Sequence, residues 1–533
     1  MRIVRWVGGL AFVGACGCGH NQAGADGSGG DEGGSVPPPP AACVSSDAPA
    51  DAVAEPTVML DLSDSWEEGW LGSPAVADLD GDGSNEIVAA RANVLVVWNA
   101  DGSLRFRYEN VPGRIWSSPV VADITGDAAL EVAFAAREQL TVIDADGADL
   151  PGFPVTWEDE LRSLAAGDLD GDGDLELVVA PARGGPSDVM HAFGGNGQSV
   201  SGFPPNATGS SGCDEACYLA GCFDQNVAVG DLDGDERHDI VVPHDNAYAS
   251  IHHGSGEAFD AASGFSATKT PGVRYLHDLR QAQQGWAEDE ATALQAHFTN
   301  TAPAIADVDG DGTAEVVMLA SVQNAAQDRR EQGVALWVVR SDASRLPGWE
   351  TPFHAPDYLD GLWDYGDNMV AVTNQVTVAK LDPDRDGPQF VFAGFDGRIH
   401  AVDARAQEMW TARYTDRAAS GTAGVAVADL SGDGSPEIVF ASYSTTPNVS
   451  SLFILDAGGN ELHRIPLPAR GSMAVPTIAD VDGDGTLEIV VSLKDTEEAS
   501  VRIFSVPSAA DNCVQWPTGR GNLLRNGDAS WIE

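Results

Sequence analysis

The residues with the clearest chemical potential are acids arranged in a short motif that recurs along the chain. Its first copy reads DLDGDGSNEIV and begins at Asp78. The copy places acidic oxygens at positions 1, 3, 5 and 9, and such hard oxygen donors are the ligands that Ca²⁺ prefers. Glycines at positions 4 and 6 permit the positive φ angles of a loop that folds around an ion. The motif therefore predicts a calcium-binding loop.

Seven copies of the motif carry a complete or nearly complete ligand set. Five copies hold four carboxylates each, and two hold three carboxylates and a hydroxyl. The predicted ligands are Asp78, Asp80, Asp82, Glu86, Asp123, Thr125, Asp127, Glu131, Asp168, Asp170, Asp172, Glu176, Asp231, Asp233, Asp235, Asp239, Asp307, Asp309, Asp311, Glu315, Asp429, Ser431, Asp433, Glu437, Asp480, Asp482, Asp484 and Glu488. Ala128 replaces the glycine at position 6 of the second copy, so we expect weaker binding there.

An eighth, degenerate copy reads KLDPDRDGPQFVF and occupies 380–392. Counting from Asp382 puts Phe390 at position 9, whereas counting from Lys380 puts a lysine at position 1. Either register loses a ligand, so we expect this copy to hold no ion.

Three alternatives to calcium loops are weaker. Plain Asp-Gly turns without an ion would leave three or four like charges close together in each of seven loops. Magnesium demands a rigid octahedron, which such a flexible loop does not offer. An EF-hand needs an acid at position 12 and flanking helices. Here position 12 is apolar in all seven copies, from Ala89 to Val491.

The segments around each loop indicate strands rather than helices. Apolar stretches such as SPAVAD precede the loops, and runs such as EIVAA and ELVVA follow them. A turn, a third strand such as VLVVW and an outer strand come next. The copies start 45 to 76 residues apart, and a propeller blade of four short strands needs roughly 40–50 residues. We predict an all-β fold, a β-propeller of four-stranded antiparallel blades. Eight blades are expected, or seven if the degenerate copy is an insertion.

At this point the chain resembles the FG-GAP/VCBS repeat family, the calcium-loop propellers related to the integrin α-subunit head. The resemblance covers about 70–510, although the Phe-Gly and Gly-Ala-Pro residues are eroded to forms such as GSPAVAD. The tail WPTGRGNLLRNG, at 516–527, also resembles the closing segment of exported bacterial repeat propellers. The resemblance implies structural calcium ions. The erosion places integrin-type ligand binding in doubt.

Composition excludes several classes of function. The chain has 29 Lys and Arg against 81 Asp and Glu, a formal net charge of −52. Such a chain does not neutralise phosphates, so nucleic acid is excluded as a partner, and the folded body is not attracted to anionic lipid. Hydrophobic residues make up 43%, which is enough for a large core.

The N-terminus predicts export. Two arginines precede a short apolar run, and Val13-Gly14-Ala15-Cys16 resembles the lipobox of bacterial lipoproteins, in which the cysteine is lipidated. We predict a signal peptide at 1–16 with lipidation at Cys16, Cys18 being the weaker candidate. A Gly/Ser/Pro-rich tether follows at 17–42, and the propeller fills 43–533. A lipid anchor would be its sole membrane contact. We expect an outer-membrane or cell-surface lipoprotein, or alternatively a secreted protein, that is a monomer.

Six cysteines remain beside the predicted lipid anchor, and an exported chain favours disulfides over thiols. Cys43 and Cys513 flank the propeller, so a bridge between them would tie its two ends. Cys213, Cys217 and Cys222 cluster in one segment, where we expect one pair. A zinc site is less favoured there, because no histidine stands at matching spacing.

Three insertions are expected near 181–225, 243–300 and 320–368. One contains the best helical pattern of the chain, Leu276 to Phe298. Another interleaves aromatic residues with acids: Trp349, Phe353, Tyr358, Trp363 and Tyr365. These aromatic residues either stack on a ligand or pack the insertion against its blade. Because three consecutive blades carry the insertions, they could form one raised patch if they leave the same face.

No catalytic motif is found in the sequence. His252-His253 is the only pair of adjacent histidines, and we interpret it as part of a surface strand or loop. The predicted function is therefore binding or adhesion: a calcium-stabilised propeller at the cell surface that presents its loops to a protein or polysaccharide. The alternative is a propeller-fold polysaccharide lyase or sugar-modifying enzyme, which would need His, Tyr, Lys or Arg side chains gathered near the central channel or the insertions.

Overall fold

The fold is known from a computed structural model. The described residues are 43–46, 49–63, 68–157, 160–182, 188–213, 227–284, 294–298, 301–323, 332–362, 374–495, 499–510 and 513–530. The predicted signal peptide, the tether, Cys16 and Cys18 lie outside them. So do Cys217, Cys222, Trp363 and Tyr365. Within these ranges no helix has the length and apolar character needed to cross a bilayer.

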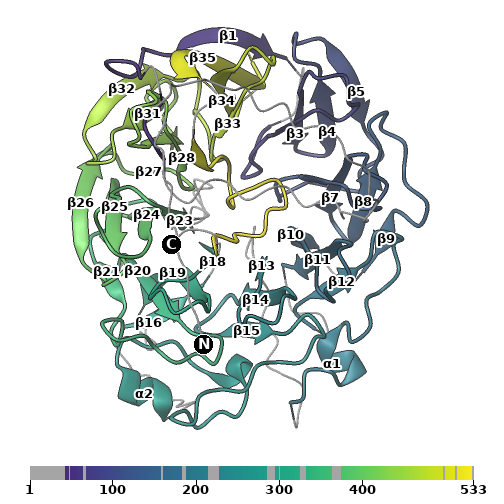
Figure 1. Ribbon diagram of the computed structural model, residues 1–533, viewed down its shortest axis with the longest axis vertical. Coiled ribbons are helices and arrows are strands. Elements are labelled where there is room, and N and C mark those ends of the chain that lie inside the picture. Colours follow the sequence, from purple (N-terminus) through teal and green to yellow (C-terminus); the bar gives the residue numbers. More distant parts are fainter. Residues whose placement is uncertain are drawn as a thin grey trace, which may run out of the picture. The chain divides into compact units, whose positions relative to one another are not determined.

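Eight small antiparallel sheets follow one another around a ring (Figure 1). Blades 1, 2 and 6 are plain four-stranded meanders. Blade 1 contains β2 (Ala75–Ala77), β3 (Glu86–Arg91), β4 (Val94–Trp98) and β5 (Leu104–Tyr108). Blade 2 contains β6 (Val120–Ala122), β7 (Glu131–Ala136), β8 (Gln139–Ile143) and β9 (Val155–Thr156). Blade 6 contains β23 (Thr377–Ala379), β24 (Gln389–Ala393), β25 (Arg398–Asp403) and β26 (Glu408–Arg413).

Blades 3 and 4 each have three strands, and blade 5 has five. Blade 3 contains β10 (Leu161–Gly167), β11 (Glu176–Pro181) and β12 (His191–Phe193), and blade 4 contains β13 (Ala228–Gly230), β14 (Asp239–Pro243) and β15 (Ala249–His252). Blade 5 contains β18 (Ala304–Ala306), β19 (Glu315–Gln323), β20 (Val334–Val339) and β21 (Phe353–Ala355), with β16 (Gln295–His297) paired to β19. The eight-bladed form of the prediction is thus confirmed, because the degenerate copy builds blade 6.

Strands from the two ends of the described chain complete the last two blades. Blade 7 contains β28 (Ala426–Ala428), β29 (Glu437–Ala441), β31 (Ser451–Leu455) and β32 (Glu461–Pro466), and β36 (Val514–Trp516) pairs with the inner edge of β28. Blade 8 contains β33 (Thr477–Ala479), β34 (Thr486–Ser492) and β35 (Val501–Ala510), and β1 (Thr57–Leu62) supplies its outer strand. Pairing early residues with the last blade closes the ring.

The innermost strands form a continuous circle of contacts. β33 contacts β2, and the contacts pass through β6, β10, β13, β18 and β23 to β36, then to β28 and back to β33. Short pairs lie beside this circle: β17 (Thr301–Ala302) with β22 (Asn374–Gln375), and β27 (Ser420–Gly421) with β30 (Tyr443–Ser444).

The C-terminal segment after β36 crosses the middle of the ring, where it is drawn in yellow (Figure 1). Its carbonyl groups accept hydrogen bonds from inner-strand amides of several blades, including Val121, Ala166 and Val229. Arg525 is fully buried and donates to the carbonyl oxygens of Pro74 and Pro119 at 3.0 and 2.9 Å. The tail therefore fastens the inner strands to one another.

The antiparallel order of each blade creates two different faces. Loops between first and second strands, and turns between third and fourth strands, lie on one face, which we call the loop face. Turns between second and third strands, and connections between blades, lie on the opposite face. The segments joining β19 to β20 and β21 to β22 therefore leave from the opposite face. The extra residues between β11 and β12 leave from that face as well.

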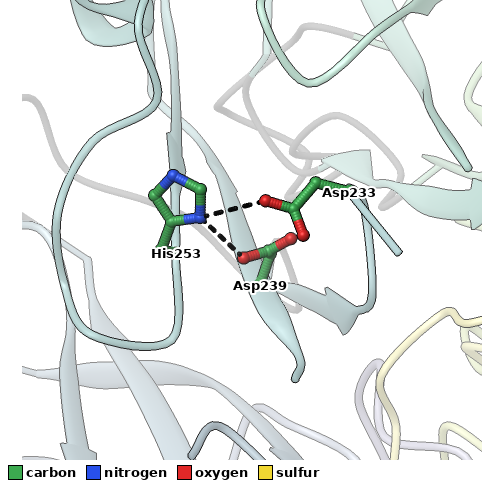
Figure 2. A group of neighbouring side chains, drawn as sticks. All are labelled: Asp233, Asp239 and His253. Atoms are coloured by element: carbon green, nitrogen blue, oxygen red, sulfur yellow. Dashed lines mark ion pairs between the residues drawn. The ribbon is translucent and has the colours of Figure 1, made fainter. Parts of the chain in front are cut away.

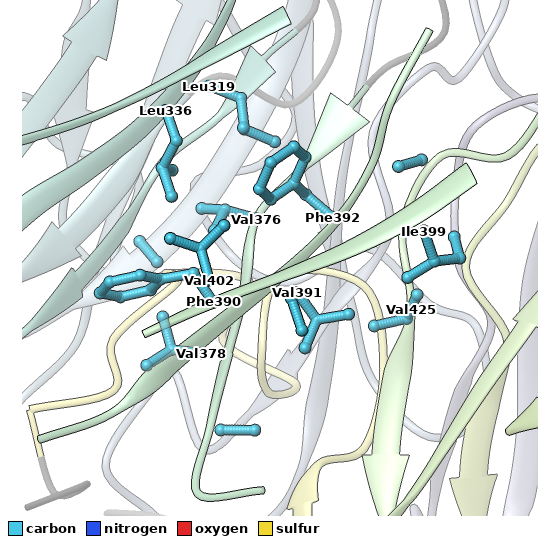
Figure 3. Packing of buried hydrophobic residues seen from close by; sticks show 14 of the residues in the cluster. Leu319, Leu336, Val376, Val378, Phe390, Val391, Phe392, Ile399, Val402 and Val425 are labelled. Atoms are coloured by element: carbon cyan, nitrogen blue, oxygen red, sulfur yellow. The ribbon is translucent and has the colours of Figure 1, made fainter. Parts of the chain in front are cut away.

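Apolar side chains fill the spaces between blades. Figure 3 shows one such cluster, in which Leu319 and Leu336 of blade 5 meet Phe390 and Phe392 of blade 6. All four side chains are buried. These strands read as continuous apolar runs because both faces of each sheet are covered.

The predicted helix from Leu276 to Phe298 is confirmed for one short segment and wrong for the other described residues. Helix α2 spans Leu279–Gln283 only, and residues 295–297 form strand β16. The other helical elements are α1 (Pro205–Thr208) and the 3-10 turn Thr270–Gly272. The apolar residues of this stretch serve blade 5 instead: Ala296 and Phe298 are buried between blades 4 and 5. Tertiary packing here overrides the helical spacing.

Cys43 and Cys513 form a disulfide that joins residues 470 positions apart. Cys43 lies before β1, and Cys513 lies immediately before β36. The covalent bond thus ties the segment that closes blade 8 to the segment that fastens blade 7.

We expect the double substitution Cys43→Ser and Cys513→Ser to lower the free energy of unfolding by about 2–4 kcal/mol, because the unfolded chain gains freedom. Urea denaturation of the oxidised wild type and the variant measures the difference. Equal stability would show that the tail and β1 hold the ring closed without the bond.

Candidate metal centres

The first aspartate of each acidic loop organises the loop backbone. In blade 3, Asp168 accepts hydrogen bonds from the amides of Gly171 at 2.7 Å, Asp172 at 3.2 Å and Gly173 at 3.0 Å. The same pattern repeats in the other acidic loops, for example around Asp307 and Asp480. The backbone is therefore wrapped around a carboxylate, with the acids of positions 3 and 5 gathered beside it.

The acid at position 9 joins the loop to the second strand. One oxygen of Glu86 accepts from the amide of Leu79 at 2.9 Å, and the equivalent contact is present in every loop. In these seven loops the position-9 side chain is buried. Its second oxygen faces the other carboxylates, as in the groups Asp78–Asp80–Glu86 and Asp168–Asp170–Glu176, whose ligand atoms lie within 4.8 Å of one another.

The donor set fits a hard divalent cation. Glu315 is 1% exposed, and its Oε1 atom accepts no hydrogen bond from the described residues. A buried carboxylate oxygen without a donor is costly unless a cation satisfies it. Oxygen donors from positions 1, 3, 5 and 9 would hold Ca²⁺, although ion binding itself stays a prediction.

Burial raises the pKa of all seven position-9 acids. It raises the pKa of Glu176, Glu315 and Glu488 to about 7 and that of Glu437 to about 8. Neighbouring carboxylates of the same loop add to the effect. A metal ion must therefore displace a proton from these sites near neutral pH.

In the degenerate copy, a lysine stands where the other loops have their first aspartate. Its register places Lys380 at position 1, and the ammonium donates to the carbonyl oxygens of Arg385 at 2.8 Å and Gly387 at 3.1 Å. Gln389 takes the place of the position-9 acid and accepts from the amide of Leu381 at 2.7 Å. A buried positive charge and a neutral amide thus reproduce the loop, which supports the expectation that this copy holds no ion.

Two acidic loops are contacted by an arginine. Arg105 Nη1 lies 2.6 Å from Asp80 and 3.7 Å from Glu86. Arg340 lies 2.8 Å from Asp309 and 3.8 Å from Glu315. Within the described chain, no basic side chain forms an ion pair with the loop acids of blades 2, 3 and 8. The charge of the loops is therefore neutralised unequally before any metal binds.

Blade 4 differs in having a histidine among its acids (Figure 2). Nδ1 of His253 lies 3.4 Å from Asp239 and 3.6 Å from Asp233. The contact with Asp239 raises the pKa of His253. The sequence did not reveal this arrangement, and the interpretation of His252-His253 as surface residues is wrong for His252, which is buried in β15. The adjacent positions point to opposite sides, as expected for a strand.

A family model described as an FG-GAP-like repeat matches residues 78–134 and 429–491. The chain carries FG-GAP-like repeats. Each matched region begins at the first aspartate of an acidic loop and ends in the second strand of the next blade. The predicted family resemblance is confirmed for these regions, and the eight blades extend the same architecture around the ring.

Comparison with solved structures shows the propeller fold. The chain is similar to the V. cholerae biofilm matrix protein Bap1, with 14% identity and a TM-score of 0.51 over 86% of this chain and 92% of that one. It is also similar to a Bacillus licheniformis rhamnogalacturonan lyase, with 14% identity and a TM-score of 0.46 over 86% and 76%. No curated protein matches the chain. At this identity the likeness concerns the fold alone.

The opposite face of the propeller gathers cations and indoles. The guanidinium of Arg114 lies 4.1 Å from the ring centre of Trp70 and 4.9 Å from that of Trp116. The ammonium of Lys494 lies 3.4 Å from the centre of Trp70 and pairs with Glu68. Burial lowers the pKa of Lys494 to about 8. Three blades meet in this cluster, because its residues precede β2 of blade 1, precede β6 of blade 2 and follow β34 of blade 8.

A cavity of about 330 Å³ opens on the same face between blades 6 and 7. Hydroxyl groups dominate its lining, including those of Thr415, Ser444 and Tyr443, and Arg417 stands at its edge. Arg470 lies within hydrogen-bonding distance of the Tyr443 hydroxyl, at 3.5 Å, so the cavity adjoins the cation cluster.

The described aromatic residues of the 320–368 insertion pack inward. Trp349 is 1% exposed and donates from Nε1 to the carbonyl oxygen of Ala404 at 2.8 Å. Phe353 and Tyr358 pack against the hydrophobic cluster that contains Trp349. Two roles were predicted for these aromatic residues, stacking on a ligand or packing the insertion against its blade. The three described residues have the second role.

Cys213 is disulfide-bonded as well. Its predicted partners, Cys217 and Cys222, lie outside the described residues.

We expect Asp168→Ala to remove one Ca²⁺ per chain and to lower the melting temperature in calcium, because Asp168 orders a complete loop. Asp382→Ala is the matched control, since it loses a half-exposed ion pair with Arg385, worth at most about 1 kcal/mol, and one hydrogen bond from the amide of Asp384. Metal analysis and calorimetry measure both effects. Wild type should hold about six or seven Ca²⁺, and two or fewer would contradict the loop assignment.

We expect calcium to reverse the pH dependence of stability. Without metal, the folded chain keeps protons on Glu176, Glu315 and Glu488 that the unfolded chain releases above about pH 4.5, so stability should fall as pH rises from about 4.5 to 7. With saturating Ca²⁺, stability should rise over the same range. Melting curves in EDTA and in calcium test this, and parallel profiles would exclude competition between proton and metal.

Proposed function

We propose that Ca²⁺ ions in seven acidic loops hold the blade hairpins together and that the resulting propeller is a binding module. The supporting observation for calcium is the repeated cage in which a buried position-9 acid turns one oxygen toward the loop. An ion satisfies that oxygen and offsets the repulsion within each group of carboxylates. Metal binding then contributes directly to the free energy of folding.

We propose that the ligand binds on the face opposite the acidic loops. The observation that carries this proposal is the hydroxyl-lined cavity beside a cluster of cations and indoles. Hydroxyl, guanidinium and aromatic groups suit a polysaccharide, whose hydroxyl groups need donors and acceptors. The segments that join β19 to β20 and β21 to β22 leave from the same face and could enlarge this surface. The loop face, by contrast, is occupied by metal ligands.

The two faces of the propeller differ in charge, and we propose different roles for them on this basis. Most of the carboxylates of the repeats lie in the loops, whereas Arg114, Arg470 and Lys494 gather on the opposite face. Arg470 and Lys494 are already paired with Asp495 and Glu68, so the attraction for an acidic polysaccharide rests on Arg114 and Arg417, whereas the acidic loops repel it. We propose an exported, surface-exposed monomer that presents this face outward, with a lipid anchor or secretion as the two modes of export. The alternative ligand for this face is a protein.

A second candidate is an enzyme that cleaves or modifies an acidic polysaccharide. The specific observation in its favour is the contact of Tyr443 with Arg470 beside Lys494, whose lowered pKa suits a general base. Lys494 is 2% exposed and already pairs with Glu68, so we favour the binding module.

We expect the intact protein to bind a subset of acidic glycans on an array. Arg417→Ala should weaken this binding about 10-fold or more, because a hydrogen bond to a charged group is lost. Arg405→Ala is the matched control, since Arg405 is an exposed arginine in a turn on the loop face. A wild type that binds no glycan would contradict the polysaccharide proposal.

The same glycans should remain intact during incubation. Formation of unsaturated sugar ends, followed by absorbance, would favour the enzyme instead. Loss of that product in Lys494→Met, with folding retained in melting curves, would assign the chemistry to this cluster.

A further inference from the structure

The turn that follows the third strand places one residue at an equivalent position in seven blades, six of which have an acid at position 9 and one of which, blade 6, has Gln389 there. In each case its amide donates to the carbonyl oxygen four residues later, which identifies the position. The residues are Asn99, Asp144, Gly194, His253, Arg340, Asp403 and Asp456. Only blade 4 places an imidazole there, so its loop alone combines oxygen donors with a nitrogen donor at this position.

The blade-4 loop differs from the other six acidic loops at position 9 as well. Asp239 stands where those loops have glutamate, and its carboxylate is one methylene shorter. One oxygen of Asp239 accepts from the amide of Leu232 at 3.0 Å, which fixes the side chain. The other oxygen faces His253 (Figure 2).

The separations of the facing atoms match a shared metal better than direct hydrogen bonds. Nδ1 of His253 lies 3.4 Å from Asp239 Oδ1 and 3.6 Å from Asp233 Oδ2. An N–H···O hydrogen bond normally spans 2.7–3.2 Å. Ligand atoms bound at about 2.0–2.1 Å in a tetrahedron lie roughly 3.3–3.4 Å apart. A cation between the three side chains would therefore need little movement of them.

The imidazole is held in place by a neighbouring ring. His253 stacks on Phe259, with ring centroids 3.6 Å apart and an interplanar angle of 29°. Such support orients a ligand before the metal arrives. The side chains of His253 and Asp233 are 35% and 33% exposed, so water can reach the site and complete the coordination.

We infer that His253, Asp233 and Asp239 form a mixed nitrogen–oxygen site for a borderline divalent metal such as Zn²⁺. Calcium prefers six to eight oxygen ligands, whereas imidazole suits zinc and other first-row metals. The blade-4 site is thus chemically distinct from the all-oxygen loops. The two proposals share Asp233 and Asp239, so a metal bound here takes the place of Ca²⁺ in the blade-4 loop, while the other six acidic loops keep the proposed calcium role.

The test is a titration of the full-length, calcium-saturated protein with Zn²⁺, followed by calorimetry and metal analysis. We expect one Zn²⁺ per chain to bind in millimolar Ca²⁺. His253→Asn, which installs the blade-1 residue at the same position, should weaken zinc binding at least about 10-fold. His463→Gln is the control, because His463 contacts the carbonyl oxygen of Val53 rather than an acidic loop.

A spectroscopic measurement needs no variant. Co²⁺ bound in place of Zn²⁺ should give the intense visible absorption of a low-coordinate nitrogen–oxygen site, and added Zn²⁺ should remove it. The inference is overturned if wild type binds no Zn²⁺ in calcium or if His253→Asn binds it equally well. Asp168→Ala separates the two metal proposals, because it should lose a Ca²⁺ and keep the Zn²⁺.

Discussion

A buried carboxylate at the start of the second strand in seven of the eight blades is the constraint on which the rest of the propeller depends. Its hydrogen bond to the amide at position 2 locks the loop to the strand, and its other oxygen must be satisfied by something positive. The chain supplies that charge in different ways. Arginines approach the acids in blades 1 and 5, and His253 does so in blade 4, whereas blade 6 has Gln389 in place of the acid and Lys380 in place of the first aspartate.

The ring itself is closed by elements from both ends of the described chain. β1 completes blade 8, β36 extends blade 7, and a disulfide joins the two segments. The tail then crosses the middle and bonds to inner strands of successive blades. Acidic loops on one face and this tail in the centre leave the opposite face free to carry insertions, a cavity and a cation cluster.

Several features of the site were invisible in the sequence for a physical reason. Trp70, Trp116 and Lys494 are far apart along the chain, and only the closed ring brings blade 8 beside blade 1. His253 gave no signal because its partners, Asp233 and Asp239, lie across a hairpin rather than at a motif spacing. The helical spacing of the apolar residues from Leu276 led to a wrong prediction. These residues pack against a neighbouring blade instead of lying on one face of a helix.

The sequence by itself determined the repeated hairpin and the ligand types. Acids at positions 1, 3, 5 and 9, glycines for positive φ and flanking apolar runs are local features, and local geometry needs no distant partner. Tertiary structure decided the number of blades, the register of the degenerate copy and whether Trp349 packs inward or faces a ligand. These depend on which strands meet when the ring closes. A lysine can take the place of an ion only where the surrounding fold directs carbonyl oxygens toward its ammonium group. The carbonyl oxygens of Arg385 and Gly387 do this for Lys380.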